Sequence, residues 1–179
     1  KGLAYQHDLE RARTLLETVL DAIPSMIILY SPQRKIMLVN RARAASVGLT
    51  KEAYLNSDSP YPALDPAFHA KQDELLNSVV KSGLPLITQN FVRRPNGDER
   101  TVNTQFIPQI DKSGTLHNIL SIVDDVTDRV EAESRIREQE EMFRSIFNNT
   151  PTAIVLKDME GRIQAANRVW REWFRSEDW

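Results

Sequence analysis

Apolar side chains recur at steps of three and four residues in two long stretches of the chain. Such steps place the apolar residues on one face of a helix. The first stretch predicts a helix over residues 5–22, which ends at Pro24 because proline cannot continue a helix. The second predicts a strongly charged helix over residues 125–147. The first stripe consists of Leu9, Ala12, Leu16, Val19 and Ile23, and the second of Arg129, Ala132, Ile136, Gln139, Phe143 and Ile146.

Between these two helices the pattern changes to that of β-strands. Strands are expected at residues 26–30, 35–39, 86–93, 100–107 and 116–123. Turn residues at 95–98 and 111–114 separate the last three strands, which therefore form antiparallel hairpins. The side chains of Val102, Thr104 and Phe106 alternate onto one face of their strand, and this alternation predicts a sheet with one apolar face.

Two further helices are expected between the first hairpin and the third strand. A short one covers residues 41–46, and a longer one covers residues 66–82. Asp65 is the expected N-cap of the longer helix, and Gly83 closes it. Residues 51–64 are expected to be rich in loop, because this segment contains two prolines. The apolar stripe of the longer helix includes Phe68, Leu75, Leu76, Val79 and Val80.

Composition removes several classes of function. The chain has no cysteine, so it holds no disulfide, thiol nucleophile or cysteine-based metal site. Its net charge of −2 predicts no nucleic-acid partner. No apolar run approaches the roughly 18 residues of a membrane span, and we expect a cytoplasmic protein. Because the chain begins with Lys1 and not with Met, we expect a piece of a longer protein, which could be membrane-anchored upstream of residue 1.

The chain also repeats itself. When Pro24 is placed on Pro151, about thirty residues run in register without a gap, and Asn40 then falls on Asn167. The offset of 127 residues is too long for a solenoid and is typical of whole domains. We therefore expect a tandem array of one module, of which the second copy breaks off soon after it starts.

Several local motifs occur in a fixed order. A strand that ends in Asn has the sequence IMLVN at 36–40. The same motif recurs within LKDMEGRIQAAN at 156–167. A basic hairpin, RPNGDER, occupies 94–100, and DVTDR follows at 125–129. The run RIREQEEMFR at 135–144 is typical of a helix that links two domains. Together these motifs resemble the PAS family of sensory domains, although Ser31 and Arg34 stand where the family usually has Asp and Gly.

This resemblance implies an α+β fold, in which a five-stranded antiparallel sheet carries helices on one face and is flanked by long N-terminal and C-terminal signalling helices. The expected parts are an amphipathic helix at 1–23, a first PAS domain at 24–126, a linker helix at 127–149, and the start of a second, truncated PAS domain at 150–179. Residues 152–175 are not expected to form an independent domain, because an isolated hairpin is marginal in water.

The resemblance also implies a non-catalytic sensory and dimerisation module in a bacterial-type signalling protein. The expected output is a histidine kinase or a diguanylate cyclase further along the same chain. Asp125 is expected to cap the exit helix, and Asp128 adds charge that suits the helix dipole. Asp125, Thr127 and Asp128 are therefore the expected signal relay between the sheet and the linker helix.

A homodimer is expected through the N-terminal and linker helices. A narrow stripe of apolar residues suits a parallel pair of helices from two chains, whereas packing on a sheet usually needs a wider stripe. The alternative is that Leu16 and Val19 cover the sheet of their own module.

The inner face of the sheet is the expected ligand site. It consists of Asn90, Val92, Val102, Thr104, Phe106, Ser121 and Val123. A mostly apolar face with a few polar groups suits a small organic ligand, and a packed core is the other interpretation. The alternatives for function are accordingly a haem- or small-ligand-binding receptor and a ligand-free protein-interaction spacer.

No catalytic set and no metal site can be assembled from the motifs, and no cofactor is expected. Haem-binding relatives commonly take their axial ligand from the helix that holds His69, so haem at His69 is the less favoured alternative. Flavin is disfavoured, because light-sensing relatives use a cysteine and place amide side chains where this chain has Val102 and Val123. His7 and His117 are expected on the polar surface.

Overall fold

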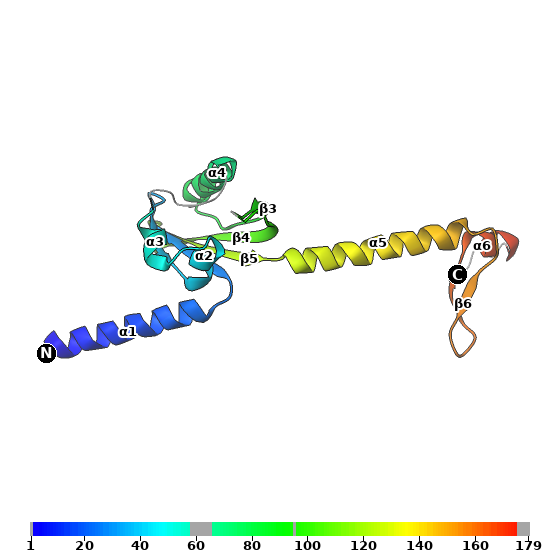
Figure 1. Ribbon diagram of the computed structural model, residues 1–179, viewed down its shortest axis with the longest axis horizontal. Coiled ribbons are helices and arrows are strands. Elements are labelled where there is room, and N and C mark those ends of the chain that lie inside the picture. The colour runs from blue at the N-terminus through cyan, green and yellow to red at the C-terminus, as the bar shows by residue number, and fades with distance from the viewer. Residues whose placement is uncertain (1, 58–65, 95, 175–179) are drawn as a thin grey trace. The chain divides into compact units, whose positions relative to one another are not determined.

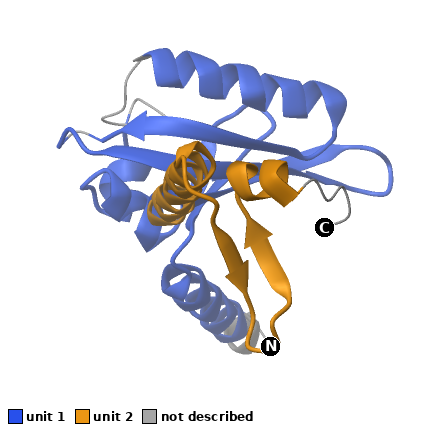
Figure 2. Ribbon diagram, turned by 90° about the vertical axis from the view of Figure 1, so that its right-hand side faces the viewer, with its two compact units in different colours: residues 1–127 blue, residues 128–179 orange. Residues whose placement is uncertain are grey.

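The computed structural model of the chain describes residues 2–57, 66–94 and 96–174 (Figure 1). The chain divides into two compact units, residues 1–127 and residues 128–179, which Figure 2 shows in different colours. The first unit holds the predicted sheet, and the second holds most of the charged helix and the second copy of the repeat.

The first unit contains a five-stranded sheet in which every pair of neighbours is antiparallel. Its strands are β1 (Met26–Tyr30), β2 (Ile36–Val39), β3 (Leu86–Arg93), β4 (Glu99–Ile110) and β5 (Leu116–Asp125), in the order β2-β1-β5-β4-β3. All five predicted strands are present, and the predicted α+β architecture is confirmed. β4 and β5 are longer than predicted, because their pairing continues beyond the alternating segments to Asp125 at one end and Ile110 at the other.

The helices of this unit are α1 (Gly2–Ala22), α2 (Arg41–Ser46), α3 (Lys51–Leu55) and α4 (Pro66–Ser82). As Figure 1 shows, α2, α3 and α4 lie on one face of the sheet. The segment expected to be loop-rich, residues 51–64, begins with α3, a helix that was not predicted separately. The hydroxyl oxygen of Thr50 caps α3 by accepting the N–H of Ala53 at 3.1 Å. The two prolines of that segment and the predicted cap Asp65 lie outside the described residues.

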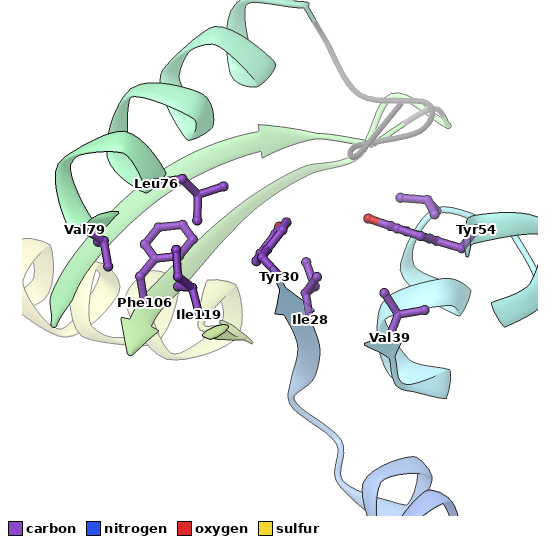
Figure 3. Packing of buried hydrophobic residues seen from close by; sticks show 9 residues of the cluster. Ile28, Tyr30, Val39, Tyr54, Leu76, Val79, Phe106 and Ile119 are labelled. Carbon is purple, nitrogen blue, oxygen red and sulfur yellow. The ribbon is translucent and has the colours of Figure 1, made fainter. Parts of the chain in front are cut away.

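The core lies between the sheet and these helices. The cluster consists of Ile28, Tyr30, Val39, Val47, Tyr54, Leu76, Val79, Phe106 and Ile119. In Figure 3, Leu76 and Val79 of α4 lie beside Phe106, while Tyr54 of α3 lies at the other end of the cluster. Burying each large side chain of this kind contributes on the order of 1.5–3 kcal/mol. The stripe predicted on the long helix therefore faces the sheet, as expected.

The turn of the first hairpin keeps its shape without a glycine. Arg34 has a positive φ of 67°, and its N–H donates to the carbonyl of Ser31 at 2.8 Å. At the 127-residue offset, Gly161 has a φ of 84° and its N–H donates to the carbonyl of Asp158 at 3.0 Å. The departure from the family pattern in the first hairpin therefore leaves the turn itself unchanged.

The charged helix, α5 (Thr127–Asn149), has the bounds expected for the linker helix and begins two residues later than its apolar stripe predicted, because β5 continues through Asp125. It is followed by β6 (Val155–Lys157), β7 (Ile163–Ala166) and α6 (Arg168–Phe174). β6 and β7 form a two-stranded antiparallel sheet. Within the described ranges, none of the helices combines the length and the apolar character that a membrane crossing requires.

Candidate functional site

A small cavity lies in the first unit between the sheet and its covering helices. Its volume is about 40 Å³. Strands β1, β3, β4 and β5 and helices α2 and α4 all contribute to its lining. The apolar part of the wall consists of Met26, Ile28, Tyr30, Val47, Phe68, Val92, Val102 and Val123. One water needs about 10–15 Å³ in this measure, so the cavity has room for a small group of atoms.

The structure brings most of the predicted ligand residues to this cavity. Five of the seven line it, namely Val92, Val102, Thr104, Ser121 and Val123. Phe106 does not line it; its side chain is 1% exposed and packs within the core cluster. Asn90 is also buried, but it lines a neighbouring depression beside Phe68. The ligand-binding role of all these residues stays a prediction.

Among the polar side chains of the cavity wall that were not predicted, two are buried. Arg43 of α2 is 7% exposed and Gln72 of α4 is 3% exposed, and both line the cavity. The positions of both residues relative to buried apolar residues could have indicated that they face the core. Gln72 stands four residues after Phe68 and four before Leu76, inside the apolar stripe, and Arg43 stands four residues before the buried Val47.

Arg43 has an unusual environment for a buried cation. Its Nε donates to the hydroxyl of Tyr54 at 2.8 Å, and its guanidinium carbon lies 5.4 Å from the centre of the Tyr54 ring. No carboxylate among the described residues pairs with it. Burial raises the pKa of the Tyr54 hydroxyl, while the charge of Arg43 and its hydrogen bond oppose that rise. The net rise keeps Tyr54 neutral.

Three side chains near the cavity have buried polar atoms without a partner in the part of the chain that the structure describes. They are Nε2 of Gln72, Nε of Arg100 and both amide atoms of Asn90. Gln72 and Arg100 line the cavity itself. Buried polar groups are normally hydrogen-bonded, so these atoms mark the region where a bound molecule would find partners.

Asp125, the last residue of β5, joins the cavity wall to the start of α5. Its Oδ2 lies 3.1 Å from a terminal nitrogen of Arg94, which lines the cavity. Its Oδ1 accepts the N–H of Thr127 at 3.2 Å and the hydroxyl of Thr127 at 2.6 Å. The Thr127 hydroxyl in turn accepts the N–H of Thr101 in β4 at 2.9 Å. Two of the three predicted relay residues therefore form one network, whereas Asp128 is exposed in the first turn of α5.

The pKa of Asp125 reflects this network. Burial alone would raise it, but the hydrogen bonds from Thr127 and the charges of Arg94 and Arg100 outweigh the burial and lower the pKa below the usual value of 3.8. The carboxylate is therefore ionised at neutral pH and holds its partners as a charged acceptor.

The alternative haem ligand is not part of this cavity. His69 is half-buried on α4 and is not among the residues that line the cavity. Among the described residues, no group of three or more His, Cys, Asp or Glu side chains is placed to hold a metal ion. His117 is exposed at the start of β5, where its Nε2 lies 2.8 Å from Asp111.

Comparison with protein families identifies the module. The family model described as PAS fold matches residues 20–131, which include the whole sheet and its covering helices. The chain belongs to the PAS family. A second model, described as PAS domain, matches residues 141–178 in the second unit of this PAS protein.

Solved structures of PAS proteins share the fold. The PAS domain of BvgS from Bordetella pertussis is 24% identical, with a TM-score of 0.55, over 74% of this chain and 98% of that one. A sensory box histidine kinase/response regulator from Burkholderia thailandensis E264 is 17% identical, with a TM-score of 0.51, over 73% and 98%. The Vibrio cholerae VqmA dimer, described in the absence of its target DNA, is 17% identical, with a TM-score of 0.55, over 63% and 50%. None of the curated proteins matches the chain.

Proposed function

We propose that residues 24–126 form a non-catalytic sensory module, whose cavity binds a small molecule and whose state reaches an output domain through α5. The observation that carries the proposal is the double position of Arg94. Its side chain lines the cavity, and its guanidinium pairs with Asp125 at the start of α5. A molecule in the cavity therefore acts on a side chain that holds the first turn of the helix.

The network around Asp125 connects the hairpin between β3 and β4 to the start of α5. Arg94 belongs to the hairpin between β3 and β4, and Thr127 is the first residue of α5. When a ligand in the cavity displaces the Arg94 side chain, Asp125 loses a charged partner while it still accepts two hydrogen bonds from Thr127. The side chains of Arg94 and Asp125 are 28% and 31% exposed, so we expect this pair to contribute about 1 kcal/mol after screening by solvent.

Hydrogen exchange at the start of α5 tests the relay. We expect Asp125→Asn and Arg94→Gln each to speed amide exchange in residues 127–131 by about fivefold, because a loss of about 1 kcal/mol raises local opening by that factor. The double variant should exchange no faster than either single variant, since both changes break the same contact.

Arg93→Gln is the matched control. Arg93 is the neighbouring arginine, lies outside the cavity lining, and pairs with Glu99 on the surface. Its loss should leave exchange in α5 unchanged. The relay is excluded if Arg94→Gln behaves like this control, or if the effects of Arg94→Gln and Asp125→Asn simply add.

We also propose that the module acts as a parallel homodimer through its N-terminal and linker helices. The exposure of α1 supports this part of the proposal. Leu9, Leu16 and Val19 are 61%, 58% and 52% exposed, and this favours an interface over the alternative in which Leu16 and Val19 cover their own sheet. Ile136, Phe143 and Ile146 on α5 are exposed as well. Such stripes are usually covered by a partner helix.

The proposed output is a histidine kinase, with a diguanylate cyclase as the alternative. The Burkholderia relative is described as a histidine kinase, and this supports the first choice at the level of the shared fold. No nucleic-acid partner is proposed, since a net charge of −2 gives little attraction for phosphates.

A further inference from the structure

The cavity wall presents hydrogen-bond donors and no carboxylate. None of the described residues that line it is Asp or Glu, while three are arginines. The two lining atoms that burial leaves without a partner, Nε2 of Gln72 and Nε of Arg100, are both donors. A neutral ligand that donates as many hydrogen bonds as it accepts would not require a wall that is rich in donors. A wall of this kind favours a ligand whose polar end only accepts hydrogen bonds.

The charges of the three arginines are not equally compensated. Arg94 pairs with Asp125 at 3.1 Å, and Arg100 lies 3.4 Å from Asp98. Arg43 is the most buried of the three and has no carboxylate partner among the described residues. Its Nε donates to the Tyr54 hydroxyl, and a guanidinium has two further amino groups that can donate hydrogen bonds. Buried charges in proteins are normally paired. The environment of Arg43 is therefore that of a cation whose anionic partner is missing.

The remaining wall limits the size and shape of the missing anion. Val92, Val102 and Val123 present only hydrocarbon, and the volume of about 40 Å³ holds the centres of only a few atoms. A phosphate or sulfate has oxygens on every side, so some of them would lie unsolvated against the valines. A short carboxylate has one polar end and one apolar end, and the wall offers both cationic and hydrocarbon side chains.

We propose that this cavity binds a short-chain monocarboxylate, with the carboxylate paired to Arg43 and hydrogen-bonded by Gln72, and with its hydrocarbon end against the three valines. This inference rests on the proposed sensory function and specifies the chemical class of its ligand. A guanidinium can hold a carboxylate through two parallel hydrogen bonds, and the terminal amino groups of Arg43 are the donors available for them.

Titration with matched pairs of small molecules tests the inference. The probes are acetate, propionate and butyrate, with propionamide as the neutral equivalent of propionate, and inorganic phosphate. Binding is followed through the backbone amide resonances of Val102, Thr104 and Ser121. We expect propionate to bind at millimolar concentration or below. Propionamide and phosphate should bind at least about tenfold more weakly, because a hydrogen bond to a charged group is worth about this factor.

Three single variants locate the anion. Arg43→Gln and Gln72→Met should each weaken propionate binding, by about tenfold or more for the first and less for the second. Arg41→Gln is the matched control, since Arg41 lies on the same helix, is exposed and is absent from the cavity lining. It should leave the affinity unchanged.

A fourth variant keeps the inference testable if Arg43→Gln folds poorly. Arg43→Met removes the unpaired buried charge while it fills most of the same space. Without ligand, its melting temperature should be at least that of the wild type, although it should no longer bind propionate. A lower melting temperature would mean that contacts within the protein already stabilise the buried charge of Arg43. This result would overturn the inference.

The outcomes separate this inference from the proposed function. Equal binding of propionate and propionamide, or phosphate binding more tightly than propionate, overturns the carboxylate while a small-molecule sensor remains. If no probe binds, the carboxylate inference fails, and the exchange experiment on α5 still decides whether the relay exists.

Discussion

Asn40 and Asn167 make the same four side-chain hydrogen bonds at positions 127 residues apart. Each side-chain oxygen accepts the N–H of the residue 13 positions earlier and of the residue 3 positions later, at 2.9 to 3.1 Å. Each side-chain nitrogen donates to the carbonyls 20 and 15 positions earlier, at 2.8 to 3.0 Å. In both copies one amide side chain therefore joins the end of a long helix, the following strand and the start of a short helix.

The two asparagines should differ in their effect on stability. Asn40→Ala leaves several buried backbone groups without a partner, so we expect a loss of about 3 kcal/mol in the free energy of unfolding. Asn167→Ala removes the same local bonds from a two-stranded sheet, which contributes little to the cooperative unfolding of the first unit. Urea denaturation followed by circular dichroism measures both. Equal losses would show that the second copy folds together with the first.

Phe106 is expected to act through stability. Its ring is 1% exposed in the core, so Phe106→Ala should lower the free energy of unfolding by about 3–5 kcal/mol. The matched control is Phe91→Ala on the neighbouring strand β3, where the ring is 83% exposed and the expected loss is below about 0.5 kcal/mol. Denaturant melts of the two variants check this difference. A small loss for Phe106→Ala would show that Phe106 contributes little to the core, and Phe106 would again be a candidate ligand-binding residue.

The strands could be predicted because their signals are local. The period of two residues and the turns at their ends lie within each hairpin. Helix α3 could not be found in this way. It has five residues, and its stability depends on the cap of Thr50 and on the burial of Tyr54 under the core, which is a tertiary contact. The two prolines that follow α3 in the sequence favour a loop, and this signal is stronger than the local signal for so short a helix.

The cavity could be predicted only in part for a related reason. Alternation tells which side chains of β4 face inward, and Val102 and Thr104 do line the cavity. It does not tell where a helix closes over the sheet, and this decides that Phe106 packs while Val102 stays beside open space. Arg43 and Gln72 were missed because a polar residue on a helix is expected to face water, although their spacing placed them on the apolar faces.

The stabilising effect of Asp125 should depend on pH. Its folded pKa lies below the unfolded value of 3.8, so its contribution is fully present above about pH 4 and is lost as the pH falls through the folded pKa. Asp125→Asn should therefore lower the free energy of unfolding by about 1 kcal/mol at neutral pH. The difference from the wild type should shrink below pH 4, where the wild-type carboxyl also becomes neutral. Urea melts at a series of pH values measure it, and a difference that grows toward low pH would contradict the sign.

The purified protein is expected to be colourless. His69 does not line the cavity, and a volume of about 40 Å³ is far below the roughly 300–1,000 Å³ of pockets that enclose larger ligands. The absorption spectrum of the purified protein should therefore show neither a Soret band nor flavin absorption. A Soret band that His69→Ala removes would instead establish the haem receptor.

The last prediction concerns the dimer. On α1, Leu9, Leu16 and Val19 follow the spacing of a coiled-coil seam and are all more than half exposed. Ile136, Phe143 and Ile146 stand at the equivalent positions of α5, 127 residues later. Apolar side chains that repeat with this spacing are usually covered by a second helix, and a parallel pair would place each residue opposite its own copy. A glutamate at such a position would bring two like charges together at the seam.

We therefore expect the wild type to sediment as a dimer and the double variant Leu9→Glu/Leu16→Glu as a monomer at the same concentration. The control introduces two glutamates with the same seven-residue spacing on the opposite side of the helix, as His7→Glu/Thr14→Glu, and should remain dimeric. Both pairs add the same number of acidic groups to α1, so a difference between them reports the seam and not the charge. A monomeric wild type, or equal dimerisation of the two double variants, would remove α1 from the interface.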